Sequence, residues 1–334
     1  MILMTTPIHL IYAGGTFGSH GTPLSPLPAD VFLPILTERL AEQNYHIRVL
    51  DNDVIKDSST LTPTEFVHFY RIILDAYATG VRRFVLLTGT DTLSFLAAFL
   101  AHALADLPDI SLVITGSMQP LFIPELVDYQ INKDSDAWTN LSDALGVASK
   151  HTGVYVQFYH KSLIANNTQK INSQIHDAFD GVVATFDNAN HHAVPSTAIE
   201  HKINELANLQ TRASTTHIHA IYALPNATDI LAQSISQAAA NACAIILIGY
   251  GAGNLPSSLA IIHAIDDAIA RGVRIICTTM CPFGGTNSNY AAGAWQYEHG
   301  IWAAGTLSIA GIYGQALWLS LNDKLSDTHW TITP

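Results

Sequence analysis

The chain has 334 residues, and its 15 lysines and arginines are outnumbered by 27 aspartates and glutamates, which gives a formal net charge of −12 at pH 7. Because nucleic-acid phosphates are bound by clustered cations, this balance argues against nucleic acid as a partner. Hydrophobic residues make up 49% of the sequence, which indicates a globular protein with a sizeable core, but charged residues make up only 13%. So small a share of charge favours a surface partly buried between subunits, and we expect a homodimer or a homotetramer.

The first two apolar runs each lead into a loop of glycine and threonine. His9–Tyr12 precedes Ala13-Gly14-Gly15-Thr16, and Phe84–Leu87 precedes Thr88-Gly89-Thr90-Asp91-Thr92. An apolar segment of helical length, Leu93–Leu104, follows the second loop. This order of strand, loop and helix is typical of a parallel sheet covered by helices.

The same order recurs further along the chain. The remaining predicted strands are short apolar runs, at Leu112–Ile114, Val154–Phe158, Ile221–Leu224, Ala244–Ile248 and Val273–Cys277. Two further helices are predicted at residues 229–240 and 257–270. In open α/β sheets ligands bind beyond the carboxyl ends of the strands, so the small-residue loops mark the expected site.

A polar segment rich in histidine, asparagine, threonine and serine interrupts this order between residues 186 and 216. We therefore predict two α/β domains joined by a linker. The larger N-terminal catalytic domain, residues 1–188, is expected to have a parallel-type sheet with helices on both faces, and the smaller C-terminal α/β domain spans residues 216–334. The linker, residues 189–215, includes Val194–Leu209, where we expect a short strand and a turn.

The cysteines and the apolar runs bear on location. Three cysteines, Cys243, Cys277 and Cys281, fit a reducing compartment better than a disulfide framework. The N-terminus lacks the basic region and the long apolar stretch of a secretory signal, and no apolar run reaches the roughly 18 residues of a membrane span. We therefore expect a cytoplasmic protein without a membrane partner.

Several common chemistries lack their motifs in this sequence. Gly251-Ala252-Gly253 would need a third glycine to make a dinucleotide fingerprint, and Pro256 stands there instead. Neither a P-loop lysine motif nor a G-x-S-x-G elbow occurs. The 16 histidines are scattered and none lies in an H-E-x-x-H motif, so we expect no metal site.

What remains is a set of hydroxyl groups in glycine-flanked loops after strands. Gly14-Gly15-Thr16 would let the backbone approach a ligand and present one hydroxyl. In Thr88–Thr92 a threonine stands beside a carboxylate, which suits a nucleophile or an acid–base pair. Each loop is equally compatible with a turn whose side chains cap the next helix, and the residues alone leave both interpretations open.

Taken together, these loops resemble those of the bacterial L-asparaginase family. Five further segments are similar to family motifs and follow in the same order along nearly the whole chain: Asp57-Ser58-Ser59 with Thr62-Pro63, Val113–Ser117, Ser135–Leu141 with Ala137 in place of a glycine, Asn167–Lys170 with the following His176–Phe179, and Gly249–Asn254. The first of these and the D-A-F run at 177–179 are closest to the cytoplasmic, type I branch.

The resemblance implies the catalytic roles. Thr16 would be the first nucleophile, attacking the side-chain amide carbonyl of the substrate to give an acyl-enzyme. Thr90, Asp91 and Lys170 would form a second group of hydroxyl, carboxylate and amine, in which the lysine acts as a base when its amine is neutral. Asp91 would also meet the substrate's α-ammonium group. From the residues alone, Lys170 is equally compatible with a solvated cation on a loop.

The resemblance also implies substrate-binding residues. Ser58 and Ser59 would bind the α-carboxylate, although Asp57-Ser58-Ser59 is equally compatible with a plain turn. Asn254 would reach the site from a neighbouring subunit, or it is a turn residue after two glycines.

Backbone N–H groups beside the two threonines would complete the substrate site. Those near Thr16 and Thr90, where Gly15 and Gly89 stand, are candidates for an oxyanion hole. The expected partner is a small amino-acid amide.

Two positions depart from the family pattern. The family places a tyrosine on the mobile loop after G-G-T, where it assists the nucleophile and closes the site, but Phe17–Leu36 contains no tyrosine. His20 lies in this stretch and is a candidate for an alternative base near neutral pH, although a surface histidine is the commoner case. The second departure is Thr88, which replaces a histidine that is not a proton-transfer residue in the family's usual scheme.

The function implied by the resemblance is hydrolysis of L-asparagine to L-aspartate and ammonia, with L-glutamine a poorer substrate and no cofactor. Two alternatives stay open. One is a broader amidase acting on glutamine or a D-amino acid amide, and the other is a non-catalytic amino-acid-binding sensor with an altered lid. Cys281 lies in a run similar to one of the type I branch, which suggests a second, regulatory asparagine site near the subunit interface.

Overall fold

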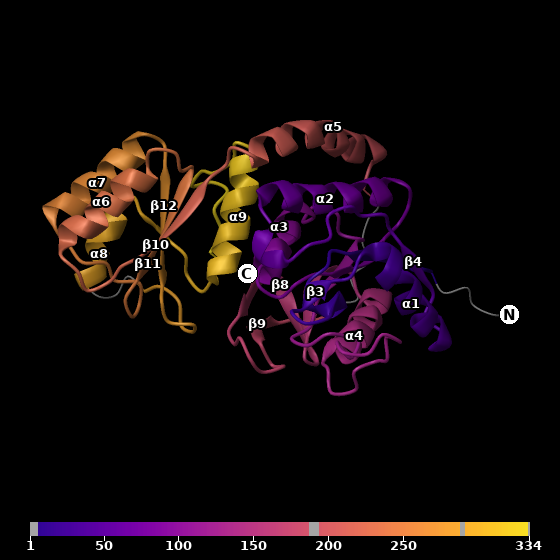
Figure 1. Cartoon of the computed structure of the whole chain (residues 1–334). Coiled ribbons are helices and arrows are strands. Elements are labelled where there is room, and N and C mark those ends of the chain that lie inside the picture. Colours follow the sequence, from indigo (N-terminus) through magenta and orange to yellow (C-terminus); the bar gives the residue numbers. More distant parts are fainter. Residues whose placement is uncertain (1–5, 187–193, 288–290, 333–334) are drawn as a thin grey trace. The chain divides into compact units, whose positions relative to one another are not determined.

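The computed structural model describes residues 6–186, 194–287 and 291–332. The chain divides into two compact units, Met1–Gln210 and Thr211–Pro334, each of which has its own sheet and helices (Figure 1).

The first unit is built on a seven-stranded sheet with the order β4-β1-β5-β6-β7-β8-β9. The strands are β1 (Ile8–Tyr12), β4 (Ile47–Val49), β5 (Arg83–Leu87), β6 (Ser111–Thr115), β7 (Gly153–Phe158), β8 (Lys161–Lys170) and β9 (Phe179–Val183). The strands β4, β1, β5, β6 and β7 pair in parallel, whereas β8 pairs antiparallel with β7 and β9 pairs antiparallel with β8 at one edge of the sheet. The predicted parallel-type sheet is therefore confirmed, with an antiparallel addition that the apolar runs did not reveal.

Helices cover both faces of this sheet, as predicted (Figure 1). They are α1 (Ala29–Glu42), α2 (Pro63–Ala78), α3 (Leu93–Ala103) and α4 (Ala137–Lys150). Helix α5 (Ser196–Ala213) lies beyond α2 (Figure 1), and Gln210 of α5 donates to the carbonyl of Thr64 in α2. Side chains of α1 and α4 pack with Leu10, Val85 and Val113 in one buried core. Phe84 and Leu86, whose side chains point to the opposite face of the sheet, are also fully buried. Helices cover both faces, so the strands are apolar on both sides.

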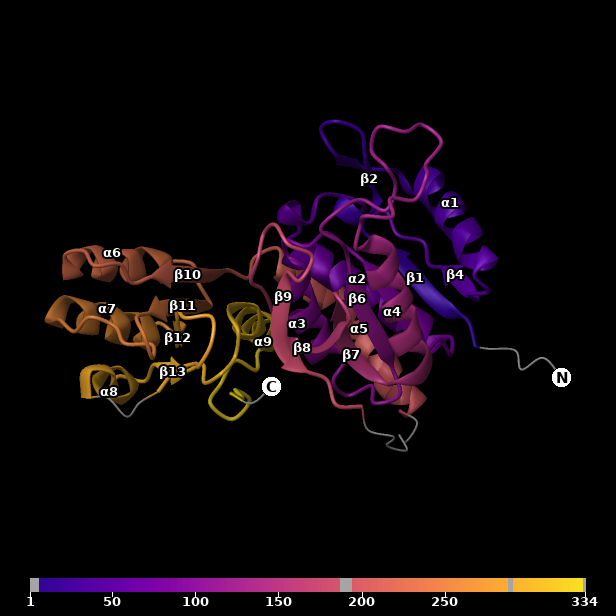
Figure 2. The same ribbon diagram turned by 90° about the horizontal axis from the view of Figure 1, so that it is seen from below.

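The second unit repeats the architecture on a smaller scale. Its parallel sheet has the order β10-β11-β12-β13, and Figure 2 shows these strands side by side. The elements are β10 (Ile218–Tyr222), α6 (Thr228–Ala238), β11 (Ala244–Gly249), α7 (Leu259–Ala270), β12 (Arg274–Thr279), α8 (Ala291–Glu298), β13 (Trp302–Ala303) and α9 (Ile309–Leu321). Separate apolar clusters lie on the two faces of the sheet. The predicted smaller α/β domain is confirmed.

One sequence prediction in the polar segment is wrong. Residues 196–213 form helix α5 rather than a short strand and a turn. The buried residues Ile199, Leu206, Leu209 and Ala213 recur at helical spacing, but the many polar residues between them hide this stripe in the sequence. The two compact units divide within α5, at Gln210 and Thr211. Residues 189–193 of the predicted linker lie outside the described residues, and its bounds stay a prediction.

Candidate active site

Three loops come into contact at the carboxyl edge of the first sheet. A Cβ atom added to Gly15 would lie 2.2 Å from the Cα of Gly89, and one added to Gly89 would lie 2.4 Å from the Oγ of Ser58. Gly15 also has a φ of 79°, a conformation that side chains disfavour. Glycine is therefore required where the loops after β1 and β5 meet, and the structure brings these three predicted site residues together.

The segment before Ser58 runs beside the segment before Thr16. The backbone N–H of Lys56 donates to the carbonyl of Ala13 at 3.2 Å. A Cβ on Gly14, whose φ is 87°, would lie 2.7 Å from the carbonyl oxygen of Lys56. Thr16 follows as the first residue of a single 3-10 turn, Thr16–Gly18, and is partly exposed.

Ser58 is buried and links two loops. Its Oγ accepts a hydrogen bond from the backbone N–H of Asp91 at 3.3 Å, and its carbonyl accepts one from the hydroxyl of Thr92 at 2.8 Å. Asp57 caps the turn by accepting from the N–H of Ser59 at 2.8 Å. Asp57-Ser58-Ser59 therefore forms a turn, as the turn interpretation predicted. The turn also places the buried Ser58 beside Gly89.

Lys170 joins the two residues that follow Gly89. Its Nζ donates to Thr90 Oγ1 at 2.8 Å and to Asp91 Oδ1 at 2.9 Å. Lys170 is the last residue of β8 rather than part of a loop. Its side chain is 18% exposed, whereas that of Asp91 is 60% exposed. The Lys170 amine is therefore largely buried and hydrogen-bonded within the protein, while the Asp91 carboxylate is exposed to solvent on one side.

The loop that follows Thr16 is held at its base and at its tip. Tyr12 donates its hydroxyl to the carbonyl of Leu27 at 3.1 Å. The tip is a short hairpin, β2 (Ser19–His20) with β3 (Ser25–Pro26). There His20 Nε2 lies 3.0 Å from the carbonyl oxygen of Leu126, and Figure 2 shows the two loops beside each other. One ring nitrogen of the proposed alternative base is therefore engaged with the neighbouring loop.

The burial of Tyr12 makes its hydroxyl a donor rather than a base. Burial raises the pKa of this phenol well above its ordinary value of 10. Tyr12 therefore anchors the loop and does not supply the base that the absent lid tyrosine would provide.

The S-D-x-x-x-N-L motif forms a buried hydrogen-bond centre behind the loop after β6. Asp136 accepts hydrogen bonds from the backbone N–H groups of Met118 at 3.0 Å and Gln119 at 3.1 Å. Asn140 donates to the carbonyl of Gly116 at 3.0 Å and accepts from the N–H of Tyr159 at 2.9 Å. These contacts fix the carboxyl ends of β6 and β7, so the motif serves the architecture of the site.

Thr92 and Thr88 have different surroundings. Thr92, which sequence reasoning did not assign, holds Ser58 in place through its hydroxyl; its place in the G-T-D-T run was the available signal. The hydroxyl of Thr88, where the family pattern has histidine, is buried without a hydrogen-bond partner within the described part of the chain.

Asn254 lies in the second unit. It closes a tight turn through backbone hydrogen bonds with Tyr250, which agrees with the turn interpretation. Its Oδ1 packs against α8, since a Cβ on Gly293 would lie 2.4 Å from that oxygen. Its proposed contact with substrate stays a prediction.

Across residues 6–186, 194–287 and 291–332, no group of three histidine, cysteine, aspartate or glutamate side chains is arranged to hold a metal ion. Within the same ranges, every helix is too short or too polar to cross a bilayer.

Comparison with known proteins gives consistent matches along the chain. Residues 7–197 match the family profile described as "Asparaginase, N-terminal", and residues 217–324 match "Glutaminase/Asparaginase C-terminal domain". The chain is 26% identical to the L-asparaginase of Thermococcus kodakarensis over 319 residues, which cover 91% of this chain and 90% of that protein.

Two further comparisons agree. The chain is 27% identical to L-asparaginase 1 of Escherichia coli over 296 residues, which cover 86% of this chain and 83% of that protein. The solved structure of the thermostable L-asparaginase from Thermococcus kodakarensis matches with a TM-score of 0.72 at 21% identity, covering 96% of this chain and 95% of that one.

Proposed function

Because the chain belongs to the asparaginase family and is an asparaginase-type amidohydrolase, we propose that it converts L-asparagine to L-aspartate and ammonia. The observation that carries this proposal is the contact of Lys170 Nζ with both Thr90 Oγ1 and Asp91 Oδ1, at 2.8 and 2.9 Å. This group lies beside the glycine contact that joins the Thr16 loop to Ser58.

In the first step, Thr16 Oγ attacks the carbon of the side-chain amide. A C–O bond forms, the C–N bond breaks, the hydroxyl proton ends on the departing nitrogen, and ammonia leaves an ester on the threonine. Backbone N–H groups beside Gly15 and Gly89 would stabilise the oxyanion, a contribution of about 3 to 4 kcal/mol for one donor in comparable sites.

In the second step, water attacks the ester and the threonine hydroxyl is released. Thr90 is suited to accept the water proton because its hydroxyl is hydrogen-bonded to Lys170. With the Lys170 amine neutral, its lone pair takes the Thr90 hydroxyl proton as the hydroxyl takes the water proton, so the pair acts as a general base. The net change is one amide and one water converted to one acid and one ammonia.

Substrate recognition follows from charge. The exposed face of Asp91 is complementary to the α-ammonium group of an amino acid. Ser58 Oγ accepts from the N–H of Asp91, which leaves its own hydroxyl proton for the α-carboxylate. Both contacts are made by residues close enough to order a ligand of amino-acid size.

The remaining assignments are proposals of the same kind. We place the chain in the type I branch, in the cytoplasm, and in a homodimer or homotetramer to which Asn254 contributes across subunits. The linker at residues 189–215 and a regulatory asparagine site near Cys281 belong to the same set.

The test is ammonia release by the pure protein from L-asparagine, L-glutamine and D-asparagine in separate reactions. We expect L-asparagine to be the fastest, and Thr90→Ala to lose this activity. Thr79→Ala, at the exposed end of α2, is the matched control and should behave as wild type. No ammonia from any amide, in protein shown to be folded, would overturn the proposal, and preference for another amide would replace asparagine as the substrate.

A further inference from the structure

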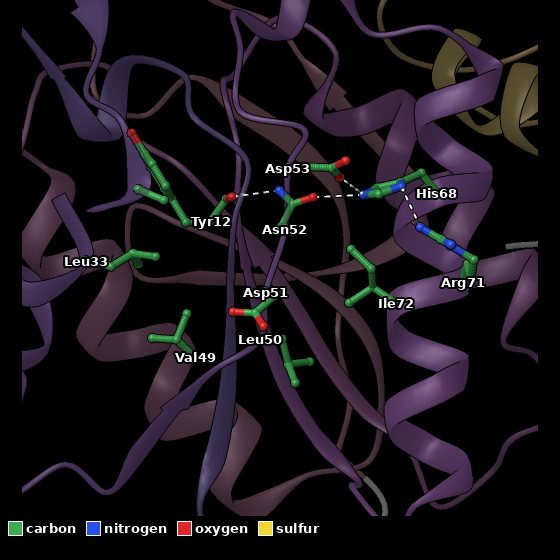
Figure 3. A pocket seen from close by; sticks show the side chains of 11 residues that line it. Tyr12, Leu33, Val49, Leu50, Asp51, Asn52, Asp53, His68, Arg71 and Ile72 are labelled. Carbon is green, nitrogen blue, oxygen red and sulfur yellow. Dashed lines mark hydrogen bonds and ion pairs between the residues drawn. The ribbon is translucent and has the colours of Figure 1, made fainter. Parts of the chain in front are cut away.

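Asn52 is one of the polar residues that line a cavity next to the end of β1. The cavity has a volume of about 350 Å³ and is lined on its apolar side by Leu33, Val49 and Ile72. Figure 3 shows Asn52 between Tyr12 and His68, with hydrogen bonds to both. Asn52 belongs to no motif and was not assigned by sequence reasoning.

All four hydrogen-bonding positions of the Asn52 amide are used. Its Nδ2 donates to the carbonyls of Tyr12 and Val54, both at 2.8 Å. Its Oδ1 accepts from the N–H of Val54 at 3.2 Å and lies 2.9 Å from His68 Nε2. Since both neighbours of Nδ2 are carbonyl oxygens, which only accept, the amide has one permitted orientation.

This orientation fixes the state of His68 on α2. Because Asn52 Oδ1 can only accept, His68 Nε2 carries the proton, and Nδ1 faces Arg71 at 3.3 Å as an acceptor. Burial lowers the pKa of His68, an effect that Asp53 opposes and Arg71 reinforces. Asn52 is therefore held from α2 by the Nε2–H of His68, which also lies 3.3 Å from Asp53 Oδ1 (Figure 3).

Asn52 replaces a missing backbone hydrogen bond beside β1. The N–H of Leu50 donates to the carbonyl of Leu10 at 2.9 Å, and that of Lys56 donates to Ala13 at 3.2 Å. Between these two contacts the segment leaves the strand, and the carbonyl of Tyr12 is bonded by the Asn52 side chain instead. Thr16 comes four residues after Tyr12.

We propose that Asn52 is a positioning residue for the loop Ala13–Thr16, and that His68 holds Asn52 in its working orientation. The inference rests on the proposed function in so far as Thr16 is the nucleophile. Asn52 touches neither substrate nor reacting atoms. It acts by fixing the backbone from which Thr16 Oγ is aimed, and small misplacement of a nucleophile is costly to rate.

The first test compares Asn52→Asp with Asn241→Asp. The change at Asn52 keeps side-chain size and the acceptor but removes both donors to carbonyls. Asn241 is the matched control, because its Oδ1 also pairs with a histidine, His219 Nε2, at 3.1 Å in the second unit. We expect kcat for L-asparagine to fall about 10- to 100-fold in Asn52→Asp, with KM changed less than about threefold, and no change in the control.

Hydrogen exchange supplies a readout that needs no turnover. Peptides covering residues 12–18 should exchange faster in Asn52→Asp than in wild type. Apart from the Asn52–Val54 turn, which loses its own contact with the Asn52 amide, the rest of the first unit should not. If wild type hydrolyses none of the amides tested but this exchange still rises, the positioning role stands and the proposed function fails. Unchanged kcat and unchanged exchange in Asn52→Asp would overturn the positioning role.

A second pair of variants, at His68, tests the positioning role if Asn52→Asp does not fold. His68→Leu removes the donor to Asn52 Oδ1, whereas His68→Gln places an amide nitrogen close to the position of Nε2. We expect the leucine variant to lose kcat and the glutamine variant to recover most of it. Wild-type kcat in His68→Leu would contradict the proposal.

Discussion

The amine of Lys170 lies 2.8 Å from the hydroxyl oxygen of Thr90, although the two residues are 80 positions apart in the chain. Helix α3 starts directly after the loop that carries Thr90, and it packs against β8, which ends at Lys170. The contact is therefore a consequence of one helix–strand packing. The packing places an amine, a hydroxyl and the carboxylate of Asp91 within hydrogen-bonding distance at the sheet edge where the glycine loops meet.

Removing the Lys170 amine should abolish most of the turnover. Lys170→Met keeps the length of the side chain but loses both hydrogen bonds, so Thr90 has no base beside it. We expect kcat for L-asparagine to fall about 100- to 10,000-fold, the usual contribution of general acid–base catalysis. Steady-state ammonia release measures this, with Lys150→Met at the end of α4 as control. Equal losses in both variants would point to a general effect of charge removal.

Asp91 should favour substrates that carry an α-ammonium group over substrates that lack one. Succinamic acid is asparagine without that group, so Asp91→Asn should lower kcat/KM more for L-asparagine than for succinamic acid. Asp91→Asn also loses the contact with Lys170, but this loss lowers kcat/KM for both substrates alike. It therefore cancels in the ratio of kcat/KM for L-asparagine to kcat/KM for succinamic acid. An unchanged ratio would mean that the carboxylate does not meet the substrate cation.

The contact between Gly89 and Ser58 should tolerate no side chain. Gly89→Ala would place a methyl group 2.4 Å from Ser58 Oγ, and we expect it to lower the free energy of unfolding by about 1 to 3 kcal/mol and to reduce activity. Gly146 is the matched control, since it lies in α4 and a Cβ there meets nothing within 4 Å. Gly146→Ala should raise stability by about 0.5 to 1 kcal/mol. Urea unfolding of both variants checks the contrast.

His102 should make the protein less stable in mild acid. Burial lowers the pKa of its ring from 6.5 to about 4, and its Nε2 has no hydrogen-bond partner among the described residues. Between those pH values the unfolded chain binds a proton that the folded chain does not. The free energy of unfolding therefore decreases as the pH is lowered, by up to about 1.4 kcal/mol per pH unit. Above pH 6.5 this effect is absent.

His102→Leu should flatten that part of the stability curve. Urea unfolding of the variant and of wild type at pH 7 and pH 5 gives the comparison, since other titrating groups contribute equally to both. A parallel fall in both proteins would show that His102 is not the group responsible.

The glycine loops were predictable because their chemistry is local. A run such as Phe84–Leu87 followed by Thr88–Thr92 shows in the sequence both a buried strand and the loop at its end. The antiparallel pair β8 and β9 was not predicted, because Lys161–Lys170 is rich in asparagine, glutamine and lysine, which are uncommon in strands. Lys170 was therefore assigned to a loop, although its role was inferred from the motif around it.

The network around Asn52 could not be predicted from the sequence. Its hydrogen bond to the Tyr12 carbonyl joins residues 40 positions apart and depends on how the segment after β4 leaves the strand. No residue type or spacing marks such a bond, since any asparagine in a loop can accept or donate one. Similarly, Thr92 stood inside a recognised run, but its contact with the Ser58 carbonyl appears only once α2 and α3 are packed.

The most direct test of the central claim is the rate of ammonia release from L-asparagine by wild type, Thr16→Ser and Thr16→Ala, each shown to be folded. The account predicts that the serine variant, which keeps a hydroxyl, retains measurable turnover and that the alanine variant falls to the background rate. Turnover by Thr16→Ala at the wild-type rate would contradict the assignment of Thr16 as the nucleophile.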